Sequence, residues 1–479
     1  MAGKRNSGRA NDRRAYRYGP GLPTATPTPT PPIPYCPPIT LADIATTMDG
    51  NTYTLNADAP PILACQTLTI PSGSSLVIPS GRIITNNGTI DNNGTITNES
   101  GGTITNNGTI DNNGGGIITN ISGGTITNNK TINNVGTIDN YGAIANNSGG
   151  IINTNGGGII TNYGGGTIDN NSGGTIATNS GGTITNNSGG TITNKLNGTI
   201  TNGADGSGTF TNDTGLINNL SGTITNKDSF TNTGLITNTG EIVNTSTGTI
   251  NNSDSGNINN NSGGKINNNS GTINIEQTSK ITNNTGGELT NNDGGIIFIA
   301  NQGKIDNTGG TINNISSLTM PPTPPSIITT STNGKITNIG VIYNFLSTIN
   351  IHNVVSGSTN QGLDNQGTIY NQSTININNG PITNYGTIDN FGGTITNGIG
   401  DTSGGTLNNA GGTITFDASS TFTNESDGII YNNSGGRITN DGTYTGSGAV
   451  NNPTVDVSCG VGILDGTHVI AATGNSCPP

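Results

Sequence analysis

One apolar position recurs along the chain at even intervals. Between residues 89 and 202 the phrase Thr-Ile-Thr-Asn or Thr-Ile-Asp-Asn alternates with glycine-rich joints, and its isoleucines are six or eight residues apart. Successive side chains of a β-strand point to opposite faces, so an even step keeps every isoleucine on one face. The pattern predicts short strands wound into a coil, with a core ladder that begins Ile90, Ile96, Ile104, Ile110, Ile118 and Ile126.

A polar position follows the same rule. The asparagine two residues after each isoleucine falls on the inner face, where the chain leaves the strand. An inward asparagine at a bend can bond the backbone of its own turn and of the next coil. Stacking therefore predicts a ladder of Asn92, Asn98, Asn106, Asn112 and Asn120. The threonines beside each isoleucine should face solvent, and the following Asn-Gly or Ser-Gly-Gly joint should supply the positive φ values of a tight corner.

These features together predict an all-β fold. Each strand contributes only one apolar side chain to the core, so no repeat could fold alone and only stacking makes the buried surface continuous. We predict a parallel β-solenoid (β-helix) of six- and eight-residue strand-turn repeats, with caps at both ends. Three sides are favoured, because two would bring facing isoleucine rows together with little else to fill the core. Low-complexity disorder is the alternative, and the strict isoleucine spacing argues against it.

Composition divides the chain into six segments. They are a flexible, basic, Pro/Thr-rich tail at 1–35, an N-terminal β cap at 36–81, solenoid repeats at 82–319, a Pro-rich interruption at 320–334, solenoid repeats at 335–445, and a C-terminal cap or docking segment at 446–479. A second interruption is expected from His352 to Leu363. Beyond residue 203 some steps are seven residues long. Each odd step needs a different corner, such as a β-bulge, if the isoleucine is to stay inside.

Charge and cysteine content narrow the function. The net charge of −12 comes from only 9% charged residues, so the repeat body should not bind nucleic acid. No apolar run approaches the roughly 18 residues of a membrane helix, and the first residues lack the apolar segment of a standard signal peptide. A disulfide at each end is favoured for Cys36, Cys65, Cys459 and Cys477, although four cysteines allow three connectivities. No Cys-x-x-Cys is present and the two histidines are far apart, so no metal site or cofactor is expected.

The repeats also carry a family resemblance. The run Gly-Thr-Ile-Thr-Asn-Asn-Gly-Thr-Ile-Asp-Asn-Asn resembles the Asn/Gly/Thr repeats of haemagglutinin-like bacterial adhesins and of surface or fibre proteins of large DNA viruses. The lead-in from Gln66 to Leu76 is similar to openings that precede such arrays. The resemblance covers about three quarters of the chain and implies a structural role outside the cell or on a virion surface.

Three other chemistries have weaker support. Asp91, Asp111, Asp139 and Asp169 could pair as carboxylates of a glycan-cleaving enzyme, but they occupy the solvent-facing threonine position and no basic residue gathers near them. Rows of Thr-Ile-Thr resemble the Thr-x-Thr faces of ice-binding solenoids, although Asp or Asn often replaces the second threonine. The repeat motif of calcium-binding β-rolls is missing. No catalytic residue is therefore predicted.

The sequence thus predicts a structural fibre, filament or surface spike that assembles with itself through its ends as a homo-oligomer or filament. A glycan or a particle surface is the other expected partner. The alternative is a surface-binding solenoid, either a glycan adhesin or an ice-binding protein, that acts through outward threonine rows.

Overall fold

The structure is a computed structural model. It describes residues 36–45, 47–205, 207–245, 247–316, 325–331, 334–352, 362–378, 380–398, 405–417, 419–424, 429–432, 437–440, 443–446, 449–451, 457–459, 464–465 and 470–471. The chain divides into two units, Met1–Pro37 and Pro38–Pro479. The architecture below is that of the second unit, and the predicted tail at 1–35 lies outside the described residues.

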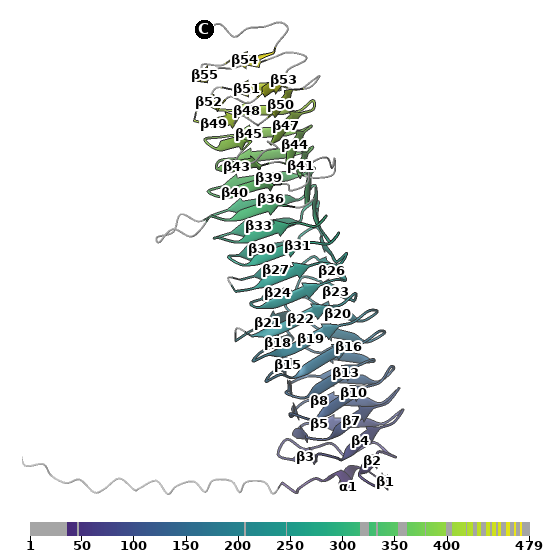
Figure 1. The fold of residues 1–479 in the computed structure, drawn as a ribbon. Coiled ribbons are helices and arrows are strands. Elements are labelled where there is room, and N and C mark those ends of the chain that lie inside the picture. The colour runs from purple at the N-terminus through teal and green to yellow at the C-terminus, as the bar shows by residue number, and fades with distance from the viewer. Residues whose placement is uncertain are drawn as a thin grey trace, which may run out of the picture. The chain divides into compact units, whose positions relative to one another are not determined.

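Three parallel sheets form the array (Figure 1). Every third strand belongs to the same sheet: sheet A runs from β4 (Ser75–Ile78) to β55 (Leu464–Asp465), sheet B from β5 (Ile83–Asn86) to β56 (Ile470–Ala471), and sheet C from β3 (Thr67–Ile70) to β54 (Val457–Cys459). In sheet B, for example, β8 (Thr103–Asn106) pairs in parallel with β5 and with β11 (Thr125–Asn128). One coil therefore holds three strands, and the predicted three-sided parallel β-solenoid is confirmed.

The register stacks equivalent residues of the repeat on each other. Ile104 pairs with Ile84 below it and with Ile126 above it. The burial pattern of most strands alternates between half-buried and buried side chains, as in β8. The isoleucine and the asparagine are the two buried positions, whereas the two threonines face outward, as the period-two pattern predicts.

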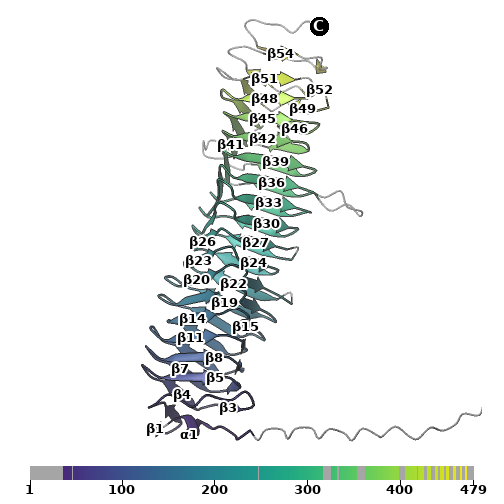
Figure 2. The ribbon, with the colours of Figure 1, turned by 180° about the vertical axis from the view of Figure 1, so that it is seen from behind.

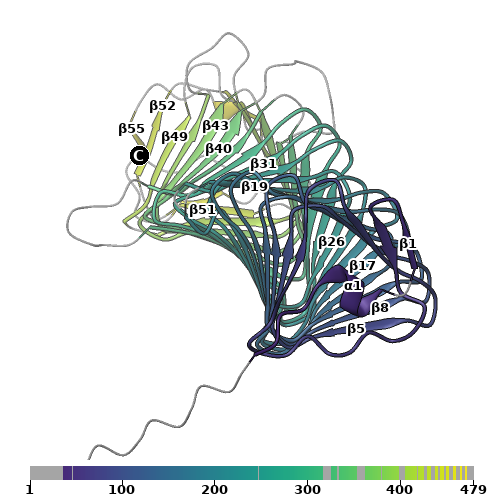
Figure 3. The ribbon, with the colours of Figure 1, turned by 90° about the horizontal axis from the view of Figure 1, so that it is seen from below.

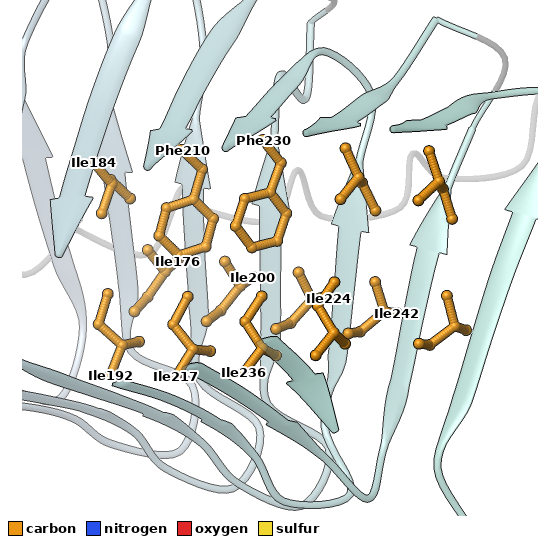
Figure 4. Close-up of a cluster of buried hydrophobic side chains, with 14 of the residues drawn as sticks. Ile176, Ile184, Ile192, Ile200, Phe210, Ile217, Ile224, Phe230, Ile236 and Ile242 are labelled. Carbon is orange, nitrogen blue, oxygen red and sulfur yellow. The ribbon is translucent and has the colours of Figure 1, made fainter. Parts of the chain in front are cut away.

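Isoleucine rows fill the interior. The six isoleucines of the predicted core ladder are all buried, with at most 3% of each side chain exposed. Figure 4 shows three such rows facing one another, with Phe210 and Phe230 in place of isoleucine in the row that contains Ile184. The two phenylalanine rings stack with centroids 4.8 Å apart. Between Leu76 and Phe210 the cavity along this interior is about 20 Å³, which is room for a water or two but not for a ligand.

Corners of two, three or four residues connect most of the strands. Two-residue corners follow the six-residue steps, and their glycines, such as Gly108, do not have positive φ. The expectation that Asn-Gly corners need positive φ is therefore wrong. A Cβ on Gly108 would lie 2.0 Å from the carbonyl oxygen of Gly88 on the coil below, so close approach between coils favours glycine there.

Longer corners do use the left-handed region. Three-residue corners follow the seven-residue steps and place one residue there, such as Thr214 (φ 56°) or Ser270 (φ 60°). This corner, rather than a bulge within a strand, absorbs each odd step. Four-residue corners follow the eight-residue steps and place in that region either a glycine, such as Gly123 (φ 85°), or another residue, such as Ser255 (φ 72°).

A short helix and a hairpin cover the first coil. In α1 (Leu41–Ile44), Leu41 and Ile44 are buried and join the hydrophobic core. The Asp43 carboxylate accepts hydrogen bonds of 2.7 Å from the hydroxyl and the N–H of Thr40, and these bonds lower the pKa of Asp43. Strands β1 (Thr47–Asp49) and β2 (Thr52–Thr54) pair antiparallel, and β2 continues sheet A onto β4. The view from below shows α1 at this end of the strands (Figure 3).

Two predicted boundaries differ from the structure. Strands β3 and β4 lie within the predicted cap at 36–81, yet they pair in register with β6 (Thr89–Asn92) and β7 (Thr95–Asn98), so the solenoid begins at Thr67. Their leucine-isoleucine pairs fill the same two inward positions as the isoleucine and asparagine of later coils.

The Pro-rich interruption is the other difference. Strand β37 (Ile327–Thr330) lies within 320–334 and pairs with β34 (Ile296–Ile299) and β40 (Thr348–His352), so sheet A continues through this range. Residues 317–324, and residues 353–361 of the second predicted interruption, lie outside the described residues. Within 446–479, strands β53 (Ala449–Asn451), β54, β55 and β56 pair with the preceding coil.

Three adjacent glycines in the four-residue corner at 113–116 separate the effect of backbone conformation from that of close approach. A Cβ on Gly114 would meet no atom within 4 Å, and φ at Gly114 is not positive. A Cβ on Gly115 would also meet no atom within 4 Å, but φ at Gly115 is +92°. A Cβ on Gly116 would lie 2.4 Å from the carbonyl oxygen of Asn92. We expect Gly114→Ala to leave stability unchanged or raise it slightly, Gly115→Ala to cost about 1 kcal/mol, and Gly116→Ala to cost more. Thermal unfolding of the three variants measures this order, and equal effects at Gly114 and Gly115 would contradict it.

Candidate functional surface

The inward asparagines form hydrogen-bonded ladders along the stack. All five asparagines of the predicted ladder are fully buried. The side-chain Nδ2 of Asn106 donates to the Oδ1 of Asn128 on the next coil at 2.7 Å and to the carbonyl oxygen of Thr131 at 2.8 Å. Asn92, Asn98, Asn112 and Asn120 make the equivalent side-chain bonds at 2.7–2.8 Å. Each amide thus joins its own coil to the next one.

One ladder is unbroken over most of the array. In sheet B the inward asparagine of each coil donates from its side chain to the inward asparagine of the next coil. The ladder consists of Asn86, Asn106, Asn128, Asn146, Asn170, Asn194, Asn219, Asn238, Asn260, Asn283, Asn307, Asn338, Asn365, Asn384 and Asn409. A net contribution of about 1 kcal/mol per bond is modest, but leaving a buried amide unpaired costs about 1–3 kcal/mol. The ladder is therefore costly to interrupt.

The other two ladders are interrupted at identifiable residues. In sheet C, Thr154 and Thr178 replace asparagine, and the buried hydroxyl of Thr154 has no hydrogen-bond partner within the described part of the chain. In sheet A, Ile275, Ile299, Ile351 and Ile377 occupy the ladder position. The first asparagine of sheet A, Asn98, stacks on Ile78, which offers no donor to its Oδ1.

The outward threonines do not form one flat hydroxyl surface. In sheet C the second outward position reads Thr69, Asp91, Asp111, Asn133, Asn153 and Ala177 over successive coils. In sheet A, Ile117 and Ile159 break the first outward row, and in sheet B a column of Lys280, Lys304 and Lys335 replaces threonine. An ice-binding face needs a continuous flat row, so we do not retain the ice-binding alternative.

The four candidate carboxylates are spread over the three sheets, with Asp139 on sheet A and Asp169 on sheet B. Only Asp91 and Asp111 are neighbours, directly opposite each other in sheet C. Asparagine side chains surround them: Asn113 donates to Asp91 at 2.5 Å, and Asn133 donates to Asp111 at 2.9 Å. These hydrogen bonds make the two carboxylates part of the polar outer face of sheet C.

Asp139 on sheet A contacts an aromatic side chain and has a raised pKa. Its pKa is raised by burial, and a hydrogen bond from the Tyr163 hydroxyl opposes that shift in part. Burial and the nearby Asp139 carboxylate raise the pKa of Tyr163. The Tyr163 ring stacks on Tyr141 with centroids 4.3 Å apart. The raised pKa of Asp139 therefore results from its burial beside the stacked pair of Tyr141 and Tyr163.

Other charges are paired along the sheet faces. Lys335 bonds Asp364 at 2.6 Å, Lys280 approaches Asp306 at 3.5 Å, and Lys195 approaches Asp169 at 3.5 Å. Such partly exposed pairs contribute about 0–1 kcal/mol each. Within the described ranges, no group of three or more His, Cys, Asp or Glu side chains could hold a metal ion.

Cys36 and Cys65 are both disulfide-bonded. The side chains of Cys459 and Cys477 lie outside the described residues, so the predicted bridge at the second end stays a prediction. Over the residues that the structure covers, no helix is both long and apolar enough to cross a membrane.

One exposed cluster was not predicted from the sequence. Tyr343, Phe345, Tyr370, Gln372, Asp389 and Phe391, together called the aromatic patch, line a groove of about 420 Å³ on sheet C. Aromatic residues are only 4% of the chain, so four of them on three consecutive coils are a notable concentration. The sequence alone did not show that they are neighbours, because the paired positions are 27 and 19 residues apart and only the strand register gives these intervals.

Comparison with known proteins assigns no family. No protein-family profile matches the chain, and no curated protein matches it. Among solved structures, the chain is similar to the crystal structure of a TibC-catalysed hyper-glycosylated fragment, TibA55-350. The match covers 82% of this chain and 99% of that chain, with 19% sequence identity and a TM-score of 0.22. At this TM-score the likeness carries no argument about function, and the proposals below rest on the residues of this chain.

A pair of substitutions tests the asparagine ladders. In Asn170→Leu, the Nδ2 of Asn146 loses an acceptor and the Oδ1 of Asn194 loses its donor. We expect a loss of about 3 kcal/mol. In Thr154→Asn, the new amide can accept from Asn134 and donate to Thr178, so we expect a gain of about 1 kcal/mol.

Thermal unfolding measures both effects, with the exposed Leu196→Asn as a control that leaves the ladders intact. A stabilising Asn170→Leu, or a strongly destabilising Thr154→Asn, would show that apolar packing rather than amide pairing sets the stability of these columns.

Proposed function

We propose that this chain is a structural surface protein: a solenoid that acts as a fibre unit or spike outside the cell or on a virion, and that assembles with copies of itself. In this proposal the protein has no enzymatic activity. The repeat array holds its ends apart and carries contact surfaces along its sides.

The asparagine ladder of sheet B is the observation that carries the proposal. It extends unbroken from Asn86 to Asn409, and the isoleucine rows between Leu76 and Phe210 leave an interior cavity of only about 20 Å³. The inward polar groups therefore join one coil to the next, and the interior between Leu76 and Phe210 offers no space to a substrate. A fold of this kind fits mechanical and spacing roles, because each added coil repeats the same bonds at about 4.8 Å per step.

The outer surface supports the same proposal. It is rich in hydroxyl and amide groups and carries few charges, several of which are paired with each other. Such a surface gives little long-range attraction for nucleic acid or for an anionic membrane. It suits repeated weak contacts, which become strong when many of them act together.

The covered first coil limits how copies can meet. The helix α1 and the hairpin of β1 and β2 occupy the end of the stack where sheet A would otherwise present a bare edge. A second copy could pair with β4 there only by displacing β2, because β2 already uses the N–H and C=O groups of that edge. We therefore place self-association at the other end of the array or along its sides.

Negative-stain electron microscopy of the full chain, beside a variant that lacks residues 446–479, tests the proposal. We expect uniform fibres or regular clusters from the full chain, and single short particles from the variant if the contact lies at that end. Single particles from both proteins, over a range of concentrations, would contradict self-assembly.

A further inference from the structure

We infer that the aromatic patch on sheet C is a carbohydrate-binding site for neutral hexopyranose chains. The inference goes beyond the structural role proposed above and does not depend on it, since a chain that stays single would still present the patch.

The patch is built on three consecutive coils. Strands β39 (Val341–Phe345), β42 (Thr368–Asn371) and β45 (Thr387–Asn390) lie one above another in sheet C (Figure 2). Two columns of side chains emerge from them. Tyr343, Tyr370 and Asp389 occupy the second outward position of the strands. The second column holds Phe345, the last residue of β39, and Gln372 and Phe391, each the first residue after its strand.

Corner length shapes the groove. Three residues separate Asn344 from Thr348, and three separate Asn390 from Thr394, but only two separate Asn371 from Thr374. The long corners each hold a residue with positive φ directly after the phenylalanine, namely Leu346 (φ 52°) and Gly392 (φ 67°). The middle corner is one residue shorter and carries Gln372. This difference leaves a recess at Gln372. Phe345 and Phe391 border the recess, and they are two coils apart, a distance of about 10 Å.

The walls of the recess are aromatic and exposed. Phe345 is 39% exposed, Tyr370 40%, Tyr343 42% and Phe391 62%. The rings of Tyr343 and Tyr370 stack with centroids 5.2 Å apart and an angle of 14° between their planes. Because the column changes from tyrosine to Asp389 on the next coil, no third ring covers the other face of Tyr370. Aromatic surface that the fold itself does not bury is typical of a binding site.

Polar groups at the same place select the ligand. Among the described residues, no side chain is hydrogen-bonded to Gln372 or to the carboxylate of Asp389, so both are available to a ligand. A pyranose ring has apolar C–H faces that pack on aromatic rings and a rim of hydroxyl groups that donate to a carboxylate or bond an amide. The groove, at about 420 Å³, holds one or two such rings.

The charge of the residues that line the groove narrows the class of glycan further. The residues that line the groove include Asp389 and neither lysine nor arginine. A sulfated or sialylated glycan would meet a negative charge with no compensating cation, whereas a neutral glycan would not. Six side chains are also few against the roughly 20–30 residues per partner of a stable protein interface.

The supporting framework is rigid. Beneath the patch the buried Asn344 donates to Asn371 at 2.7 Å, and Asn371 donates to Asn390 at 2.5 Å. The corner of Phe391 is fixed by a hydrogen bond of 2.9 Å from the Gly392 N–H to the Asp417 carboxylate. A site on such a framework is ordered before the ligand arrives, which reduces the entropy lost on binding.

Isothermal titration of the full chain with cellotetraose, maltotetraose and tetra-N-acetylchitotetraose tests the inference, with 3′-sialyllactose as the anionic probe. Tyr370→Thr and Phe391→Asn return two positions to residues common in other coils, so the fold should be kept, which circular dichroism verifies. Tyr385→Asn is the matched control, because Tyr385 is an exposed tyrosine outside the groove (55% exposed).

We expect saturable binding of at least one neutral tetrasaccharide, no binding of sialyllactose, and an affinity at least about ten-fold weaker in each patch variant. The control should bind as the parent protein does. The inference is overturned if no neutral tetrasaccharide binds, if binding survives Tyr370→Thr, or if Tyr385→Asn weakens it equally. Sedimentation of the same proteins gives a separate result: a lower mass for Tyr370→Thr would assign the patch to a second copy of the chain. That outcome would overturn the glycan site and leave the proposed self-assembly standing.

Discussion

The need to pair every buried asparagine amide constrains the rest of this structure. An amide inside a solenoid cannot reach water, and an unpaired one would cost about 1–3 kcal/mol. The solution is to repeat the same side chain at the same place on each coil, so that each Nδ2 meets the Oδ1 of its neighbour. This pairing requires strict register, and strict register in turn keeps the isoleucines in rows. Corner length can then vary, from two residues to the longer connection between Asn202 and Gly208, without disturbing the interior.

This arrangement separates the inside of the solenoid from its outside. The inward positions are nearly invariant along the chain because each must match the coil above and below. The outward positions carry no such requirement, and they hold threonine, aspartate, lysine, isoleucine or tyrosine at different heights. The outer faces are therefore the part of the molecule in which function can differ from coil to coil. The aromatic patch illustrates this freedom, since it changes six outward side chains over three coils without altering the ladder beneath them.

Sequence periodicity predicted the strands and their inner faces, because the period-two rule connects spacing directly to side-chain direction. The three sides were favoured for a different reason, the need to fill the core between facing isoleucine rows. It could not predict the corners equally well. Gly108, Gly115 and Gly116 are alike in sequence, yet close approach favours glycine at the first and third and backbone conformation at the second. Strand β37 within 320–334 was not predicted, because the prolines that precede it in sequence cannot donate to a β-ladder and indicated an interruption. The aromatic patch was missed because its members are far apart along the chain, and only the register shows that they are neighbours.

The most direct test of amide pairing inside the solenoid is the exchange of asparagine side-chain amides. Protein labelled with ¹⁵N only at asparagine would be transferred into D₂O and followed by two-dimensional NMR of the NH₂ groups. We expect two populations: outward asparagines that exchange at once, and ladder asparagines whose NH₂ signals persist far longer, since exchange there requires opening of paired coils. Loss of every side-chain NH₂ signal within the first spectrum would contradict the pairing, because it would show that the inner amides are neither buried nor hydrogen-bonded.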